Sequence, residues 1–208
     1  MDVYEAMAAR KTIRDFASTE IPPEVINRII SAGFQAPTNN HMREWHFVLL
    51  QDKRLRKDLL DQVIKPSDKK RAIRIINDWG LTDDNQREMY IDAIPKQYSM
   101  LFNAGCLILP CFCQPEPLLT PKDLSALNPF ASIWCCIENI LVAAAAEGIF
   151  GVTRIPFEAE RKIIKQFLHV PNEYEVPCYL ALGYPTGTAE RTKQVPIEIV
   201  KRLHTNTW

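Results

Sequence analysis

The stretch Arg10-Lys11-Thr12-Ile13-Arg14, at the foot of a predicted N-terminal helix, packs three cations and a hydroxyl into five residues. Two guanidinium groups can each bind an oxyanion through a forked pair of N–H donors, while Lys11 adds a point charge and Thr12 a hydroxyl. This combination suits a phosphate group. A cationic cluster at a helix C-terminus can also be solvated surface that complements the helix dipole, so the charge pattern alone leaves both interpretations open.

Length and composition favour one globular domain spanning residues 1–208, with 47% hydrophobic and 24% charged residues. Lys plus Arg and Asp plus Glu are both 25, so no net charge attracts nucleic acid or an anionic membrane, and any phosphate site must be local. The six cysteines stand in apolar runs without metal-site spacing, which indicates buried thiols in a reducing compartment. With no signal peptide in the first residues, we expect a cytoplasmic protein.

Hydrophobic periodicity and capping residues predict an alternation of helices and strands. Helices are expected at 2–9, 22–33, 52–64, 66–79, 83–94, 128–146 and around 163–167, and strands at 45–50, 105–113, 150–156 and 176–182. Residues 66–103 are expected to form a helical insert that serves as a lid or as a dimer arm. Residues 185–208 form a C-terminal arm that lies on the body or on a neighbouring subunit.

The helix that Asn128 is expected to cap is apolar nearly all round from Ala131 to Ala146. Such a helix must be buried on every side, either within the domain or in a subunit interface. Glu138 and Glu147, together with its length, argue against a membrane span. In the preceding strand, Pro110 must sit at a bulge or on a sheet edge, because proline cannot donate to a strand ladder.

Several familiar chemistries have no support in the chain. There is no glycine-rich dinucleotide fingerprint, no phosphate-loop lysine motif and no serine elbow, and the four histidines are scattered. A phosphate-sized cationic cluster without an obvious acid, base or nucleophile is typical of an enzyme whose bound cofactor carries the chemistry.

An ordered series of segments carries a resemblance to a known family. The series runs through Arg10 to Arg14 with Phe16, Ile21-Pro22, Ala36-Pro37-Thr38, Trp45-His46-Phe47, Glu138-Asn139-Ile140-Leu141, Ala143 to Gly148, Gly151-Val152-Thr153 and Leu182-Gly183-Tyr184-Pro185. Over essentially its whole length, the chain resembles the FMN-dependent nitroreductases.

The resemblance implies an α+β fold in which a mixed, largely antiparallel sheet lies between helices, assembled as a domain-exchanged homodimer with FMN at the interface. NADH or NADPH would deliver hydride to flavin N5, and a small-molecule oxidant such as a nitroaromatic or quinone would then take the electrons. No catalytic side chain and no metal are demanded.

The same resemblance implies three groups of FMN contacts. Arg10, Lys11, Thr12 and Arg14 would hold the phosphate and ribityl chain, with Arg14 nearest the pyrimidine, and Arg191 or Lys193 would complete the phosphate pocket. Pro37, Thr38 and Asn39 would come from the other subunit. Thr153 to Ile155 would line the isoalloxazine ring through backbone donors. The full candidate set is Arg10, Lys11, Thr12, Arg14, Pro37, Thr38, Asn39, His41, Gly151, Val152, Thr153, Arg154, Ile155, Arg191 and Lys193.

The chain also departs from the family pattern. Relatives commonly carry Ser at Thr38, Asn at His41, Gln at Arg43 and Pro at Glu44, so the substrate pocket of this subgroup can differ. Three alternatives therefore stay open: an FMN enzyme of another reaction type (reductive dehalogenation, enoate reduction or flavin destruction), a non-catalytic flavin-binding redox dimer, and a structural domain with a cationic surface cluster.

Overall fold

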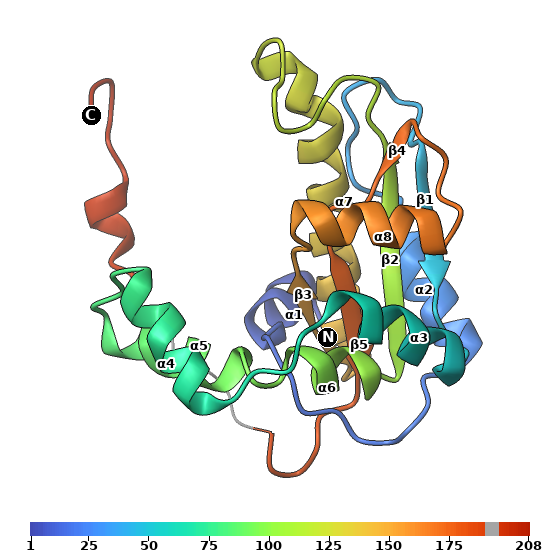
Figure 1. Cartoon of the computed structure of the whole chain (residues 1–208). Helices are drawn as coiled ribbons and strands as arrows, with labels where there is room; N and C mark the ends of the chain where they lie inside the picture. Colours follow the sequence, from blue (N-terminus) through green and yellow to red (C-terminus); the bar gives the residue numbers. More distant parts are fainter. Residues whose placement is uncertain (190–195) are drawn as a thin grey trace.

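A five-stranded sheet lies at the centre of the computed structural model, which describes residues 1–189 and 196–208 (Figure 1). Four strands pair in the order β1-β2-β5-β3, and β4 pairs with the far end of β2. The strands are β1 (Trp45–Leu49), β2 (Cys106–Cys113), β3 (Phe150–Arg154), β4 (Tyr174–Glu175) and β5 (Tyr179–Gly183). All these pairings are antiparallel, as predicted for an α+β fold.

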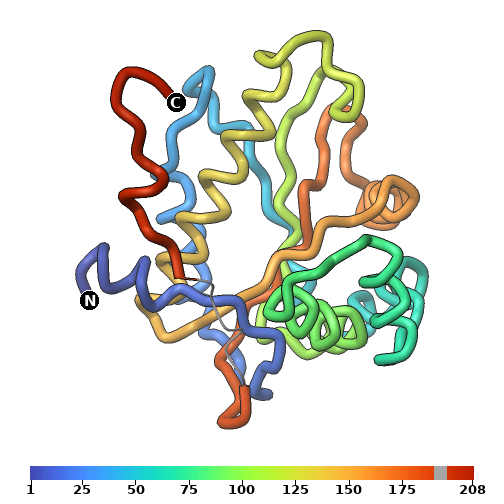
Figure 2. Tube along the Cα trace, turned by 90° about the vertical axis from the view of Figure 1, so that its left-hand side faces the viewer, coloured from blue at the N-terminus to red at the C-terminus, as the bar shows by residue number. Residues whose placement is uncertain are grey.

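Two hydrophobic cores cover the two faces of the sheet, because successive side chains of a strand point to opposite faces. Leu107, Leu109 and Cys111 of β2 join one core with α3 (Lys53–Val63), α6 (Gln97–Phe102) and α8 (Glu158–Phe167). Ile108 and Phe112 join the other core with α2 (Pro23–Gly33) and α7 (Asn128–Ala146). Figure 2 shows this three-layer arrangement edge-on.

Capping residues at several helix starts are confirmed. Asp2, Asp52 and Asp83 each accept a backbone N–H in the first turn of α1 (Val3–Ala9), α3 and α5 (Asp84–Ala93). The start of α7 is a correction. Asn128 is already helical, and the preceding 3-10 helix η1 (Leu124–Leu127), capped by Asp123, leads directly into it.

Pro110 lies in a strand with neighbours on both sides, at a break in the ladder on one of these sides. It pairs in register with Phe47 of β1. On the other side of β2, β5 pairs with Cys106–Ile108 and β4 with Phe112–Cys113. The proline therefore occupies the gap between these two partners, where a ladder donor is not required.

Helix α7 spans the predicted residues 128–146, but it is not buried all round in a single chain. With η1 it forms a run of 23 residues, Leu124–Ala146, whose length and composition alone would allow a membrane crossing. It packs instead against α2, β2 and β3 and buries Ile133, Ile137 and Ile140, as the core helix of a globular domain does. Its outer face exposes Ala131, Cys135 and Glu138.

Two segments project from the three layers (Figure 1). Helices α4 (Lys69–Asp78) and α5 pack on each other around a small core of their own, formed by Ala72, Ile76 and Ile94. Residues 196–208, which include the 3-10 helix η2 (Ile199–Arg202), are exposed throughout and stand away from the body. In a single chain residues 196–208 therefore do not lie on the body, whereas the start of the predicted arm does, since Pro185 bridges to Phe16 and the Thr186 amide donates to the Asp15 carbonyl.

Candidate functional site

The pentapeptide 10–14 runs along β3, which is an edge strand of the sheet. Thr12 forms a parallel bridge with Gly151, and the Ile13 amide donates to the Gly151 carbonyl at 3.2 Å. Arg10 follows α1, and its Nε lies 3.3 Å from a carboxylate oxygen of Glu138 on α7. The Lys11 ammonium lies over the Phe150 ring, 4.2 Å from its centroid. The structure therefore brings this segment and the start of β3 together, as the prediction requires.

Arg14 is mostly buried but incompletely paired. Its side chain is 11% exposed, one Nη donates to the Met89 sulfur at 3.3 Å, and the other lies 3.8 Å from Asp92. Its Nε is buried and has no hydrogen-bond partner among the described residues. Burial lowers the pKa of the guanidinium, and Asp92 and Asp15 partly oppose this effect. Buried donors without an acceptor are uncommon in folded proteins, so the Arg14 Nε is a candidate ligand-binding group.

The surroundings of Arg14 form a cavity of about 450 Å³. It is lined by Arg14, Asp15, Asp92, Lys96, Thr186 and Thr188. Sequence reasoning identified Arg14 here but missed Asp92 and Lys96, which lie in the helical insert nearly eighty positions away. Their spacing of four residues at the junction of two helices is the signal that places them on one face.

The loop after α2 holds a second group of candidates. Thr38 and Asn39 line a smaller cavity of about 200 Å³ together with Pro129 and Ser132 from the first turns of α7. The Thr38 hydroxyl oxygen is buried and, within the described part of the chain, has no hydrogen-bond partner. The structure does not join this cavity to the one at Arg14, since no residue lines both.

Pro37 and His41 are exposed on the same loop. His41 and Arg43 have φ values of 59° and 49°, in the left-handed region that non-glycine residues rarely adopt. Two such residues so close together store backbone strain, which functional loops tolerate more often than other segments do. The departures from the family pattern thus fall on a strained, exposed turn.

Gly151 and Val152 of β3 pack within the sheet, whereas Thr153 and the residue that follows the strand are accessible from outside. A Cβ on Gly151 would lie 2.7 Å from the Ala181 carbonyl oxygen, so this position requires glycine for sheet packing. Val152 is buried, whereas Thr153 is half-buried and Ile155 is 66% exposed. Thr153 and Ile155 are thus the members of the predicted loop that remain accessible from outside.

The side chain of Arg154 is buried and paired within the protein. Its two Nη atoms donate to the two carboxylate oxygens of Glu160 at 2.7 and 2.8 Å, and its Nε donates to Gln97 at 3.0 Å. Only its backbone remains for a ligand, which is the group the prediction invoked. Two further candidates, Arg191 and Lys193, lie outside the described residues.

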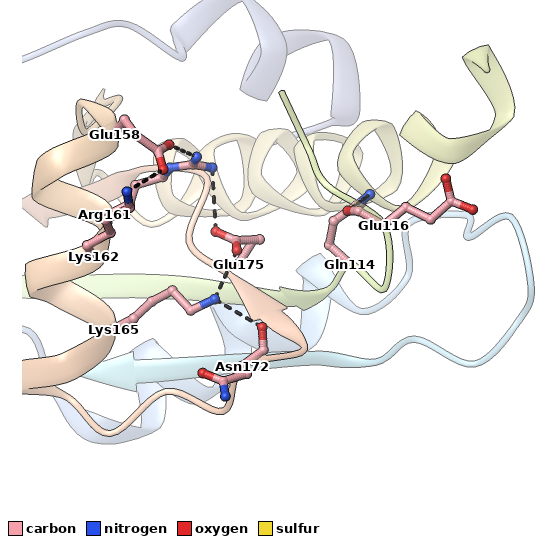
Figure 3. Close-up of polar contacts among 8 residues, drawn as sticks. All are labelled: Gln114, Glu116, Glu158, Arg161, Lys162, Lys165, Asn172 and Glu175. Carbon is pink, nitrogen blue, oxygen red and sulfur yellow. Dashed lines mark hydrogen bonds and ion pairs between the residues drawn. The ribbon is translucent and has the colours of Figure 1, made fainter. Parts of the chain in front are cut away.

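A further cavity, of about 680 Å³, lies against α8 and β4, and Figure 3 shows the polar contacts of the charged residues that line it. Its cations already have partners. Glu175 accepts from Lys165 at 2.9 Å and from Arg161 at 3.4 Å, and Arg161 also pairs with Glu158. Each of these cations has a carboxylate partner, whereas the Arg14 Nε has no hydrogen-bond partner among the described residues.

Comparisons with known proteins identify a family and a set of similar folds. The family model described as "Nitroreductase family" matches residues 7–184. The chain is 30% identical over 194 residues to the iodotyrosine deiodinase of Haliscomenobacter hydrossis, covering 90% of this chain and 81% of that protein.

Solved structures share the fold. An iodotyrosine deiodinase bound to FMN and 3-iodo-L-tyrosine superposes with a TM-score of 0.73 at 17% identity and full coverage of both chains. The NADPH:FMN oxidoreductase of Vibrio harveyi in complex with NAD⁺ gives a TM-score of 0.67 at 18% identity, covering 99% of this chain and 77% of that one.

Proposed function

The chain belongs to the nitroreductase family, and from that premise we propose that it is an FMN-dependent oxidoreductase that passes electrons from NADH or NADPH to an electron-poor small molecule. The observation that carries the proposal is the buried, unpartnered Nε of Arg14, the last residue of the pentapeptide 10–14. An unpaired guanidinium donor in a partly enclosed site suits the oxygen-rich pyrimidine end of a flavin.

The residues present fit FMN in charge and in hydrogen-bonding capacity. Bound FMN would supply the redox chemistry by accepting hydride and then releasing electrons to the oxidant. Arg10, Lys11 and Thr12 would hold the phosphate and ribityl chain, and Arg14 would stabilise negative charge near the pyrimidine. Thr153 and Ile155, at the open end of β3, would orient the ring system through backbone groups.

We further propose that the site is completed by a second copy of the chain. Thr38 has an unpartnered hydroxyl, yet it lines a cavity separate from that of Arg14. In a twofold dimer packed through the outer face of α7, the loop of one protomer can approach the pentapeptide of the other. The exposed Cys135 on that face and the projecting apolar arm, with Ile199, Val200 and Trp208, support this assembly.

A second candidate reaction is reductive dehalogenation with the same cofactor. It is favoured by the likeness to proteins named iodotyrosine deiodinase, one of which covers most of this chain at 30% identity. The two candidates differ only in the electron acceptor. Turnover of halogenated phenols, but not of quinones or nitroaromatics, by the FMN-loaded protein would favour dehalogenation.

The cofactor assignment is tested by FMN titration of wild type, Arg10→Ala, Arg14→Ala and the control Arg28→Ala. A charge-assisted hydrogen bond is worth about 1.5–3 kcal/mol, so each test variant should bind FMN roughly ten- to a hundredfold more weakly. Arg28 is an exposed arginine paired with Glu147 on another face, and its loss should change little. Equal FMN affinity in all four proteins would reject the assignment.

A further inference from the structure

One face of the helical insert is aimed at Arg14. Met89 and Asp92 lie on α5, and Lys96 precedes the first residue of α6. Their spacing of three and then four residues places them on one side of the helical path. Two of them contact Arg14 directly, Met89 through its sulfur and Asp92 through a carboxylate oxygen.

The charged groups form an alternating series across the junction between the insert and the body. Arg14 lies 3.8 Å from Asp92, Asp92 lies 2.5 Å from Lys96, and Lys96 lies 2.6 Å from Asp15. Asp15 follows Arg14 in sequence, so the series returns to the segment where it began. Two cations and two carboxylates leave the cluster neutral.

Lys96 fixes the position of the carboxylate that faces Arg14. Desolvation disfavours its charge, but hydrogen bonds to Asp15 and Asp92 outweigh that effect and raise its pKa, so it is fully charged at neutral pH. A charged Lys96 holds Asp92 at a distance from Arg14 that is longer than a close ion pair. Arg14 is thus partly neutralised while its Nε stays unpaired.

We propose that Asp92 and Lys96 are positioning residues that set how much positive charge Arg14 presents to the flavin. This inference rests on the proposed function and assigns a role to the insert beyond covering the site. A carboxylate near a cation weakens the field of that cation at a third group, by an amount that depends on distance and exposure. The insert would therefore help to set both the FMN affinity and the reduction potential of the bound flavin.

Three variants distinguish this charge effect from a purely structural role in which the ion pairs only hold the insert against the body. Asp92→Asn leaves the cluster with a net positive charge, Lys96→Met leaves it with a net negative charge, and the double variant restores neutrality. Both side chains are about a third to a half exposed, at 45% and 32%, so the substitutions should be compatible with folding. Asp61→Asn is the matched control, since it removes a Lys–Asp pair of the same (i,i+4) type on α3.

The experiment measures FMN affinity by flavin fluorescence titration of the apo proteins, and the flavin midpoint potential by spectroelectrochemistry. Asp92→Asn should bind FMN roughly two- to tenfold more tightly and raise the potential, because reduction adds negative charge. Lys96→Met should weaken FMN binding and lower the midpoint potential. The double variant should return close to wild type, and Asp61→Asn should match wild type throughout.

Other results would overturn the proposal in identifiable ways. A double variant worse than either single variant would show that the series only ties the insert to the body. Unchanged affinity and potential in all variants that bind FMN would reject the charge effect while leaving the proposed function in place. A wild-type protein that binds no FMN would reject the proposed function itself.

Discussion

Two buried arginines and the mostly buried Arg14 show how one residue type serves different purposes in this chain. Arg56 is 1% exposed and donates to the carbonyl oxygens of Leu50, Phe102 and Ala104. Arg154 is paired through two hydrogen bonds with Glu160. Arg14 has only a sulfur acceptor and a loose ion pair. The first two complete the protein's own structure, whereas the third is the one that we propose binds a ligand.

This difference predicts opposite effects on the stability of the apo protein. Arg154→Met leaves the buried Glu160 carboxylate without its cationic partner. Breaking a buried ion pair in this way typically costs about 3–5 kcal/mol. Arg14→Met removes a desolvated and poorly paired cation, so the free energy of unfolding should stay within about 1 kcal/mol of wild type or increase. Urea denaturation of the two variants measures both values. Equal losses would mean that Arg14 is a structural residue as well.

Sequence reasoning found Arg14 because its neighbours along the chain are also cationic. It could not distinguish Arg154 from a ligand-binding residue, because the burial of Arg154 depends on α8 and β5 packing against it. The role of Asp92 depends on a contact that spans 78 positions, which no local pattern reveals. Contacts close in sequence were thus predictable at this scale, and contacts made by tertiary packing were not.

At the level of elements, most helices and strands were predictable because local signals agree with the packing. Aspartate caps and alternating apolar residues marked where they begin and which faces they bury. The start of α7 and the placement of Pro110 were not predictable, since both depend on what lies next to them in space. For α7, the sequence indicated burial on every side, yet one chain covers only part of its surface.

The outer face of α7 gives a direct test of the proposed dimer. Cys135→Glu places a charge in the middle of this face, where the single chain has room for it because the side chain is exposed. In a dimer packed through α7 the new carboxylate would be buried without a partner, which is strongly unfavourable. We expect a monomer by sedimentation velocity, with FMN affinity lowered as well. A dimeric variant with normal FMN binding would place the interface elsewhere.

At the level of the whole molecule, the buried thiols predict a loss of stability in alkali. Burial raises the pKa of Cys106 and Cys111 to about 11 and that of Cys136 to about 12, and it also raises the pKa of Cys178. In the unfolded chain thiols ionise near pH 8.5. Because the folded pKa is the higher one, the contribution of each thiol to stability is complete below that pH and is lost as pH rises towards the folded value.

For each such thiol, the free energy of unfolding should fall by at most about 1.4 kcal/mol per pH unit above pH 9. Urea denaturation at pH 8, 9 and 10 measures the slope for wild type and for Cys106→Ala, which lacks one of these buried thiols. The slope should be shallower for Cys106→Ala. A wild-type slope identical to that of Cys106→Ala would show that Cys106 is ionised in the folded protein.

The division of β2 between two cores limits where the chain can change length. Its odd-numbered residues from Leu107 to Cys111 serve one core, and Ile108 and Phe112 serve the other. An extra residue at the start of this strand would move the side chains of each core to the opposite face of the sheet. Both cores would then have to pack around side chains of the wrong size and shape. Insertions and deletions in natural variants should therefore collect in the connections, such as the segment between β2 and η1, and spare the central strand.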